Sequence, residues 1–146
     1  MIYIGSDHAG FNLKEAIKTH FKSNNIEYVD VSLNVADSVC DYPDIALKLC
    51  DAVTEDVRNI GILVCGTGVG MAIAANKIKG IRAVCASDSF SVKYSKLHNN
   101  ANVLCLGGRV IGSGLGLELV DIFLNTQFEG GRHTKRLDKI KNLEDC

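Results

Sequence analysis

The feature that most constrains the fold is the stretch Gly61–Asn76, in which an apolar run leads into a glycine-rich loop and then into an alanine-rich segment. The apolar run ends at Cys65, and glycines follow at positions 66, 68 and 70. This pattern is typical of a buried parallel strand, a tight turn whose backbone amides can hold an anion, and the N-terminus of a helix. Glycine lets the backbone approach a ligand closely, because no Cβ blocks it. The sequence therefore predicts a strand–loop–helix unit with a thiol at the end of the strand.

Strand-like and helix-like segments alternate along the rest of the chain. Five strands that alternate with helices predict a three-layer α/β/α, Rossmann-like fold around a parallel sheet, with an additional C-terminal helix. For a chain of this length we expect the strand order 2-1-3-4-5. The expected strands cover residues 1–5, 26–31, 60–64, 81–86 and 103–106, and the flanking helices include residues 11–24, 115–124 and 132–143.

Length and composition limit the class of protein. The 146 residues fit one domain, residues 1–146, and 47% hydrophobic with 23% charged residues is an ordinary globular balance. A formal net charge of −1 gives no general attraction to nucleic acid or to a membrane surface. The apolar runs are too short to span a membrane, and the N-terminus begins directly as a strand rather than as a leader. We therefore expect a cytoplasmic protein without nucleic-acid or membrane partners.

The six cysteines favour free thiols over a disulfide framework or a metal site. Cys50, Cys85 and Cys105 lie inside apolar runs, and no pair has Cys-x-x-Cys spacing. A zinc site needs clustered ligands, which this spacing does not offer. We expect reduced cysteines and no bound metal.

The expected strand order places the ligand site between strands 1 and 3, outside their C-terminal ends. The loops at that point are Ser6–His8 and Cys65–Gly70. Asp7 and His8 could move hydroxyl protons or bind an anionic group. The alternative is that Asp7 caps the next helix and His8 simply lies in a turn.

Cys65 has several possible roles. A cysteine phosphatase loop requires Cys-x5-Arg, but Met71 occupies the arginine position. A nucleotide loop would continue with Gly-Lys-Ser/Thr after Gly70, which is absent. A core cysteine that happens to end a strand remains one alternative. The other is a reactive thiolate beside loop amides that could also hold an oxyanion on a carbonyl substrate.

Two groups near helix ends complete the set of candidates. His98 and Asn99 end a helix, and helix C-termini lie at the opposite edge of the sheet from strand C-termini. His98 would therefore reach Cys65 only across a subunit boundary, unless it merely interacts with the helix dipole. Arg132 and Arg136 are four residues apart on one helix face and could clamp a phosphate together with Arg109, unless they belong to a solvated charged face.

Together these residues closely resemble type B ribose-5-phosphate isomerase, in the family that includes galactose-6-phosphate isomerase. The resemblance runs from residue 1 to about residue 140. It rests on motifs that occur in the same order along the chain: Gly5-Ser6-Asp7-His8-Ala9-Gly10-Phe11, Asp41-Tyr42-Pro43, Cys65-Gly66-Thr67-Gly68-Val69-Gly70 with Ala74-Ala75-Asn76-Lys77, His98-Asn99, and Glu129-Gly130-Gly131-Arg132-His133 with Arg136.

The resemblance implies cofactor-free and metal-free aldose–ketose interconversion by a dimer or tetramer with sites at the subunit boundary. Cys65 resembles the base that moves a proton between C1 and C2, and Met71 fits the branch that uses this cysteine rather than a glutamate. His98 matches the residue that opens the furanose ring, and Asp7 the one that assists with hydroxyl protons. The remaining implied site residues are Thr67 as a catalytic residue, and His8, Tyr42, Gly66, Gly68, Val69, Gly70, Asn99, Arg109, Arg132 and Arg136 as substrate-binding residues.

The predicted reaction interconverts ribose 5-phosphate and ribulose 5-phosphate through an enediolate, in the non-oxidative pentose phosphate pathway. One alternative is a hexose-6-phosphate isomerase of the same family, acting on allose or galactose 6-phosphate. Another is a flavodoxin-like nucleotide-binding module, in which Cys65, Asp7 and Arg132 would have no chemical role.

Overall fold

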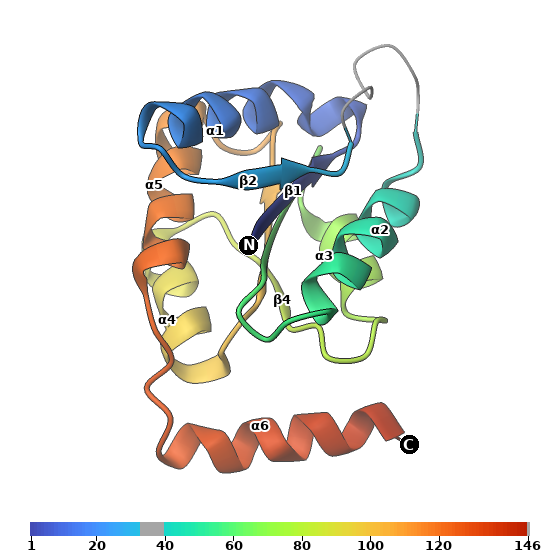
Figure 1. The fold of residues 1–146 in the computed structure, drawn as a ribbon, viewed down its shortest axis with the longest axis vertical. Helices are drawn as coiled ribbons and strands as arrows, with labels where there is room; N and C mark the ends of the chain where they lie inside the picture. Colours follow the sequence, from blue (N-terminus) through green and yellow to red (C-terminus); the bar gives the residue numbers. More distant parts are fainter. Residues whose placement is uncertain (33–39, 146) are drawn as a thin grey trace.

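A central parallel sheet flanked by helices on both faces forms the body of the protein (Figure 1). The computed structural model describes residues 1–32 and 40–145, which include every strand and helix discussed below. The expected three-layer α/β/α, Rossmann-like fold is confirmed. The strands are β1 (Ile2–Ser6), β2 (Tyr28–Asp30), β3 (Ile60–Cys65), β4 (Ala83–Cys85) and β5 (Val103–Gly107), and the helices are α1 (Phe11–Ser23), α2 (Tyr42–Thr54), α3 (Val69–Ala75), α4 (Ser89–Asn99), α5 (Ser113–Asn125) and α6 (Arg132–Asn142), with 3-10 turns η1 (His8–Gly10) and η3 (Leu143–Asp145).

The strand order is β2-β1-β3-β5-β4, so the expected order 2-1-3-4-5 is wrong for the last two strands. All five residues of β5 are buried, which suits a strand with neighbours on both sides and helices on both faces. In contrast, β4 has only three residues, none of them buried, which suits an edge. The register pairs Ile62 of β3 with Leu104 of β5, and Cys85 of β4 with Cys105 of β5. The order next to β1 and β3 is as expected, so the predicted switch point remains.

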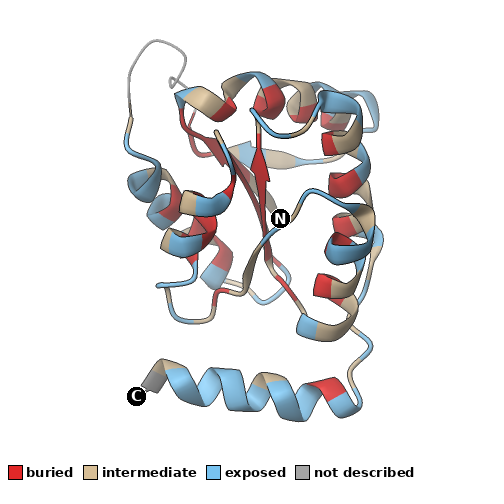
Figure 2. Cartoon of the chain, turned by 180° about the vertical axis from the view of Figure 1, so that it is seen from behind, coloured by how far each residue is buried: buried red, intermediate tan, exposed pale blue. Residues whose placement is uncertain are grey.

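Two hydrophobic clusters, one on each face of the sheet, form the core. Helices α1, α4 and α5 cover one face and α2 and α3 the other, and Figure 2 shows the buried residues on the strands and on the inner sides of these helices. Phe21, Leu119 and Phe123 are fully buried on the first face. Leu49 and Met71 are fully buried on the second. Burial of apolar side chains on both faces fixes the sheet between the two helical layers.

Helix boundaries follow local signals in the sequence. Pro43 lies in the first turn of α2, where its missing N–H costs no helical hydrogen bond. Asp88 caps α4 by accepting a hydrogen bond from the Ser91 amide at 2.7 Å. Asn100 ends the same helix in the left-handed conformation, with φ of 46°. The polar, aperiodic sequence of residues 32–42 predicts a loop, of which residues 33–39 lie outside the described residues.

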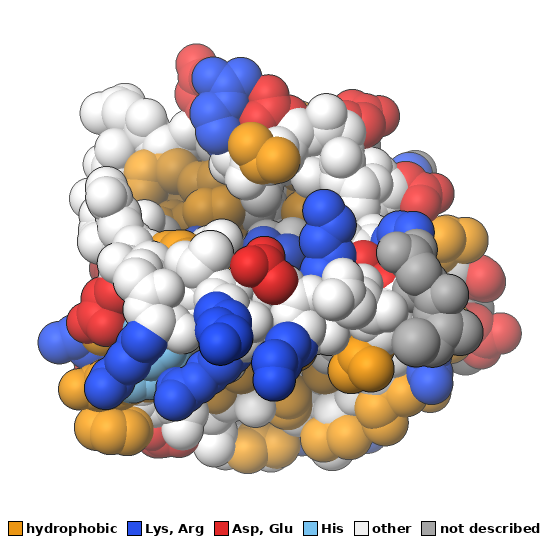
Figure 3. Space-filling model, turned by 90° about the horizontal axis from the view of Figure 1, so that it is seen from below, with side chains coloured by type: hydrophobic (Ala, Val, Ile, Leu, Met, Phe, Trp, Pro, Cys, Tyr) orange, Lys and Arg blue, Asp and Glu red, His pale blue; other side chains and the backbone are white. Residues whose placement is uncertain are grey.

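Helix α6 lies apart from the two helical layers, below the edge at which the strands begin (Figure 1). His133 is its only buried residue, whereas Ile140 and the following Leu143 are 45% and 70% exposed. Two hollows of about 650 and 570 Å³ are lined jointly by α6 and the body of the protein. Figure 3, which views this side, shows a hollow with hydrophobic side chains in it and Lys and Arg side chains gathered nearby. The contacts of α6 within this chain therefore leave much of its apolar surface uncovered.

Within the described part of the chain, every helix is too short or too polar to cross a lipid bilayer.

Candidate active site

The C-terminal ends of β1, β3 and β5 bring several of the predicted site residues to one edge of the sheet. Asp7 directly follows β1 and donates its amide to the carbonyl of Val64 at 3.2 Å. Cys65 ends β3, and its carbonyl accepts the Gly108 amide at 2.8 Å. The amide of Arg109 donates to the Gly66 carbonyl at 3.0 Å. Backbone hydrogen bonds thus join the two loops that we expected to form the pocket to a third loop, which follows β5.

The thiol of Cys65 is held by the glycine loop. Its side chain is buried, with the residue 5% exposed, and Sγ accepts a hydrogen bond from the Gly68 amide at 3.1 Å. Gly68 adopts φ of +80°, which side-chain-bearing residues rarely do. A Cβ at this position would also lie 3.0 Å from the sulfur of Cys85 and 3.0 Å from the carbonyl carbon of Leu106. Glycine is therefore required at position 68 for the amide to reach Cys65.

The rest of the loop is packed between Tyr42 and Arg109. A Cβ on Gly70 would lie 2.8 Å from the Tyr42 ring, so this ring packs directly on the glycine. A Cβ on Gly66 would lie 3.6 Å from the Arg109 side chain. Thr67 Oγ1 accepts a hydrogen bond from the Val69 amide at 3.3 Å. The aromatic ring and the guanidinium thus flank the loop beyond Cys65.

Asp7 and His8 differ in how far their side chains are exposed and in whether they are already hydrogen-bonded. Asp7 is 7% exposed and caps η1, because its Oδ1 accepts the Gly10 amide at 3.0 Å. The alternative of a capping role for Asp7 is therefore realised, which leaves its other carboxylate oxygen for a second contact. His8 is exposed and lies in the first position of η1.

A buried ion pair lies beneath this edge. Lys14 is completely buried, and its Nζ contacts Asp30 at 3.0 Å and the carbonyl of Ser32 at 2.9 Å. The Ser32 hydroxyl in turn accepts the amide of Ser6, the residue before Asp7. Burial raises the pKa of Asp30, but hydrogen bonds from Lys18 and the Ser32 amide, together with Lys14, outweigh it and lower the pKa overall. This network fixes the end of β1 from which Asp7 extends.

Two further thiols, one near His8 and one near the glycine loop, were not identified from the sequence as site residues. Burial and the nearby charge of Asp7 raise the pKa of Cys40, against an opposing hydrogen bond from the His8 amide. Burial and then Cys65 raise the pKa of Cys85, whose sulfur lies 3.6 Å from the carbonyl oxygen of Thr67. No spacing signal marks either cysteine, because both approach the site only through the fold. The described cysteines, residues 40, 50, 65, 85 and 105, all have free thiols, as expected.

The other predicted site residues lie at the opposite edge of the sheet. Helix α4 starts beyond the C-terminal end of β4 and runs back to the start of β5. Its 11 residues span about 16 Å. His98 and Asn99 at its end are therefore separated from Cys65 by the length of the sheet, as expected. Arg132 and Arg136 belong to α6 at this same edge, so the expected clamp of these arginines with Arg109 is not formed within one chain.

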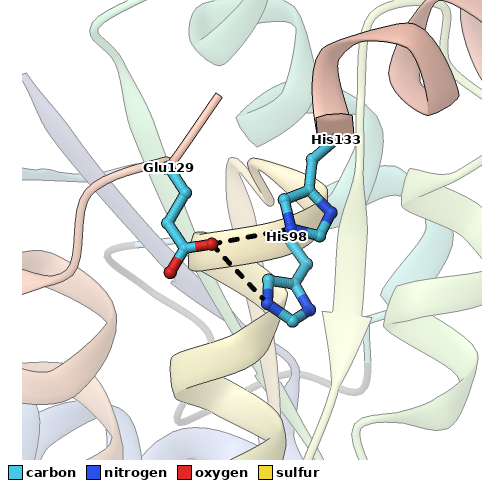
Figure 4. A group of neighbouring side chains, drawn as sticks. All are labelled: His98, Glu129 and His133. Carbon is cyan, nitrogen blue, oxygen red and sulfur yellow. Dashed lines mark ion pairs between the residues drawn. The ribbon is translucent and has the colours of Figure 1, made fainter. Parts of the chain in front are cut away.

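His98 is part of a cluster with Glu129 and His133 (Figure 4). Oε2 of Glu129 lies 3.8 Å from Nε2 of His98 and 3.5 Å from Nε2 of His133. The sequence analysis quoted Glu129 and His133 in a motif but gave neither a role. Their spacing of four residues across two glycines was the available signal.

Two histidines and a glutamate are residue types that bind metal ions, but the three side chains are not oriented to bind one ion. Ligand atoms of the three side chains lie within 4.8 Å of one another. However, the two imidazole rings are stacked 4.1 Å apart at an interplanar angle of 15°. Lone pairs lie in the ring planes, so those of two stacked rings run side by side rather than converging on one ion. Burial, His98 and the neighbouring cations Arg132 and Arg136 lower the pKa of His133, and the two arginines also oppose a bound cation.

Comparison with known proteins identifies the family. The sequence model described as Ribose/Galactose Isomerase matches residues 2–140. Ribose-5-phosphate isomerase B of Escherichia coli is 43% identical over 143 residues, covering 98% of this chain and 95% of that protein. The structure of ribose-5-phosphate isomerase B from Clostridium thermocellum superimposes with a TM-score of 0.94 at 44% identity, covering 99% of this chain and 97% of the other.

A second solved structure contains a sugar phosphate. Ribose-5-phosphate isomerase B of Mycoplasma genitalium, crystallised with bound ribulose 5-phosphate, has a TM-score of 0.93 at 43% identity, covering 99% of this chain and 95% of the other. Similarity of this extent, over nearly the whole of both chains, establishes common descent and a common fold. The chain therefore belongs to the ribose/galactose isomerase family.

Proposed function

We propose that the chain is an aldose–ketose isomerase that interconverts ribose 5-phosphate and ribulose 5-phosphate through an enediolate. The observation that carries this proposal is the thiol of Cys65, held by the Gly68 amide at 3.1 Å where a glycine loop follows the strand. A base beside fixed amide donors is what proton transfer between two adjacent carbons requires. The E. coli and M. genitalium relatives, whose names state this substrate, support the choice of a pentose phosphate.

Each step of the reaction has a candidate residue. Cys65 takes the proton from one carbon and returns it to the next, while the loop Gly66–Gly70, with Thr67, holds the enediolate oxygen. Asp7 moves hydroxyl protons through the carboxylate oxygen that η1 leaves available. This chemistry needs neither a metal nor an organic cofactor. The remaining proposed roles are ring opening by His98, phosphate binding by His8, Arg132 and Arg136, and contacts with the sugar by Tyr42, Val69, Asn99 and Arg109.

The complete site is proposed to form between two copies of the chain, in a homodimer or a tetramer. Cys65 and His98 lie at opposite edges of the sheet, so one protomer supplies the thiol and its partner supplies the imidazole. The exposed apolar residues Ile140 and Leu143 support this arrangement, because an uncovered apolar helix face favours contact with another chain. A cytoplasmic location agrees with the free thiols of the described cysteines.

The substrate is tested by comparing turnover of ribose 5-phosphate, allose 6-phosphate and galactose 6-phosphate by the purified protein. The highest kcat/KM is expected for ribose 5-phosphate, without added metal and in the presence of a chelator. The family description also contains galactose, so a clear preference for a hexose phosphate would replace the pentose assignment with the alternative activity. Thermal stabilisation by flavin or nucleotide, without any isomerisation, would instead support a flavodoxin-like binding module.

A further inference from the structure

The imidazole of His98 is held on two sides by other rings. Along α4, the Phe90 and Tyr94 rings lie 4.3 Å apart between centroids, and the Tyr94 ring meets the His98 ring edge-on at 4.8 Å and 73°. The face of His98 stacks on His133 of α6 at 4.1 Å and 15°. Such contacts restrict rotation of a ring that would otherwise be free at the end of a helix. His98 is therefore oriented before any substrate arrives.

Glu129 approaches this ring because of the path of the chain between α5 and α6. The Glu129 amide donates to the carbonyl of Leu97 at 3.1 Å, which fastens the segment to the last turn of α4. Gly130 and Gly131 then take φ of +69° and +56°, which turn the chain into α6. As a result, the carboxylate of Glu129 lies between Nε2 of His98 and Nε2 of His133, at 3.8 and 3.5 Å (Figure 4).

Only one of the two imidazoles is free to donate a proton to Glu129. Nε of Arg132 donates to Nε2 of His133 at 3.5 Å, a hydrogen bond that requires a lone pair on that nitrogen. Burial, then His98, Arg132 and Arg136, lower the pKa of His133, whereas Glu129 opposes the shift. The lowered pKa and the hydrogen bond from Arg132 both favour the neutral form of His133, with its Nε2 lone pair engaged. The carboxylate is left to attract an N–H of His98 electrostatically across the 3.8 Å that separate Oε2 and Nε2.

We propose that Glu129 is a positioning residue for His98, fixing the proton on Nε2 of its imidazole while the stacked ring of His133 fixes the ring plane. This proposal rests on the proposed isomerase function and concerns one step of it, the opening of the sugar ring. A carboxylate that faces one imidazole nitrogen favours the tautomer with its proton on that nitrogen and leaves the other nitrogen for the substrate. Glu129 itself does not touch the sugar.

Ring opening needs two coordinated proton transfers. The bond between C1 and the ring oxygen breaks, and its electron pair goes to the ring oxygen, which takes up a proton. The C1 hydroxyl loses its proton and becomes the aldehyde carbonyl, so the step is balanced without any other reactant. With the imidazole proton held on Nε2, the lone pair on the other nitrogen accepts the proton of the C1 hydroxyl and passes it to the ring oxygen, so one nitrogen carries both transfers. Ribulose 5-phosphate has no such ring, because its only hydroxyl that could close a five-membered ring carries the phosphate.

The test uses this difference between the two sugars. The variant Glu129→Gln keeps the shape of the side chain and removes its charge, and Glu55→Gln is the matched control on an exposed carboxylate of the α2 terminus. Two rates are measured by NMR in D2O, net conversion between the sugars and incorporation of deuterium at C1 of ribulose 5-phosphate. Incorporation reports formation of the enediolate, which precedes ring closure when the reaction starts from ribulose 5-phosphate.

We expect Glu129→Gln to lower kcat/KM for net conversion by about 10- to 100-fold, the size of effect seen when an orienting partner of a histidine is lost. The same factor applies in both directions, because the equilibrium constant is unchanged. In Glu129→Gln, the number of deuterium atoms incorporated per molecule converted should rise by the same factor. Its thermal unfolding midpoint should equal that of Glu55→Gln. Adding Glu129→Gln to His98→Asn has no further effect on conversion, since Glu129 acts through His98.

Three results would overturn the proposal. Wild-type conversion by Glu129→Gln would show that the carboxylate does not matter. An equal loss of conversion and incorporation would place its effect on the enediolate step, and an additive double variant would show that it acts independently of His98. Failure of the proposed function is distinguishable, because the wild-type protein would then show neither conversion nor incorporation.

Discussion

The edge of the sheet that carries Cys65 and the edge that carries His98 are built differently. At the first edge, the thiol is 5% exposed, the loop is fixed by backbone hydrogen bonds, and a completely buried lysine supports the adjacent strand. At the second edge, the cluster includes Glu129, whose side chain is 52% exposed, and a helix with His133 as its only buried residue. One chain therefore builds the first edge almost completely by its own packing. The second is ordered by side-chain contacts on an exposed surface, which favours completion by another chain.

The largest effect is expected at the first edge. Cys65→Ala removes the proposed base, so turnover of ribose 5-phosphate should fall about 10³-fold or more, within the usual range for general acid–base groups. Deuterium incorporation into ribulose 5-phosphate should fall with it. Circular dichroism and thermal unfolding check that the fold is retained.

Cys50→Ala is the control for this variant, because it truncates another buried thiol, on α2, away from the loop. It should lower the thermal midpoint without lowering turnover. Near-normal activity of Cys65→Ala would contradict the role of this cysteine as the base.

The second prediction joins the two edges. Cys65→Ala and His98→Asn should each have strongly reduced turnover alone, but unfolding and refolding them together should restore activity. In a dimer with two shared sites, random mixing gives about a quarter of the wild-type activity, because half the dimers are mixed and each has one intact site. The measurement is turnover of the mixture against the same total concentration of each variant. No recovery from a correctly mixed sample would contradict a site shared between two chains.

The third prediction concerns the packing of the glycine loop. Gly70→Ala adds a methyl group 2.8 Å from the Tyr42 ring and should displace this ring, lowering kcat/KM by about tenfold through misplaced substrate contacts. Gly114→Ala is the matched control, since a Cβ at that position in α5 meets nothing within 4 Å. It should leave activity unchanged and raise stability slightly. Equal activities of the two variants would show that contact with Tyr42 is not needed.

Removing the buried ion pair between Lys14 and Asp30 should change the stability of the protein and leave its activity almost unchanged. It is therefore the smallest expected effect on activity. Because the folded-state pKa of Asp30 is lowered, the carboxylate stabilises the fold above its unfolded pKa of about 4, and this contribution is lost as the pH falls through the folded pKa. Asp30→Asn should lower the free energy of unfolding at pH 7 by about 2 kcal/mol. Denaturant unfolding between pH 7 and pH 3 measures both quantities.

The acid-dependent loss should be smaller in Asp30→Asn than in the wild type. Asp51→Asn, which changes an exposed carboxylate on α2, is the control and should follow the wild-type curve. An unchanged pH dependence in Asp30→Asn would mean that this pair does not stabilise the edge.

Local elements of the fold and the direction of its crossovers were predictable from the sequence, but the order of the last two strands was not. The strand–loop–helix around Cys65 follows from a short continuous pattern of apolar residues and glycines. The distance between His98 and Cys65 also follows, because a helix between two parallel strands must run back along the sheet. The places of β4 and β5 do not, since the order depends on which strand is buried on both sides. Only the length and burial of each strand distinguish the edge strand. We predicted a strand of six residues over 81–86, but β4 has only three.

The candidate site shows the same division. The candidates at the strand ends were visible because parallel strands end at one edge. The ring stack of His98 and His133 depends on how α6 returns towards α4, which no periodicity encodes. Cys40 approaches His8, and Cys85 approaches the glycine loop, through the fold alone. Glu129 was present in the sequence motif, but its role depends on the two left-handed glycines that follow it.

The placement of Cys65 and His98 at opposite edges has a consequence for how the protein responds to its own abundance. Under the proposed shared site, an isolated chain has two incomplete halves and no catalytic capacity. Activity per chain then falls on dilution towards the dissociation constant of the assembly, and it rises when substrate bridges two chains. The total rate would thus depend on expression level in two ways. It depends on the number of chains and on the fraction of those chains that are assembled.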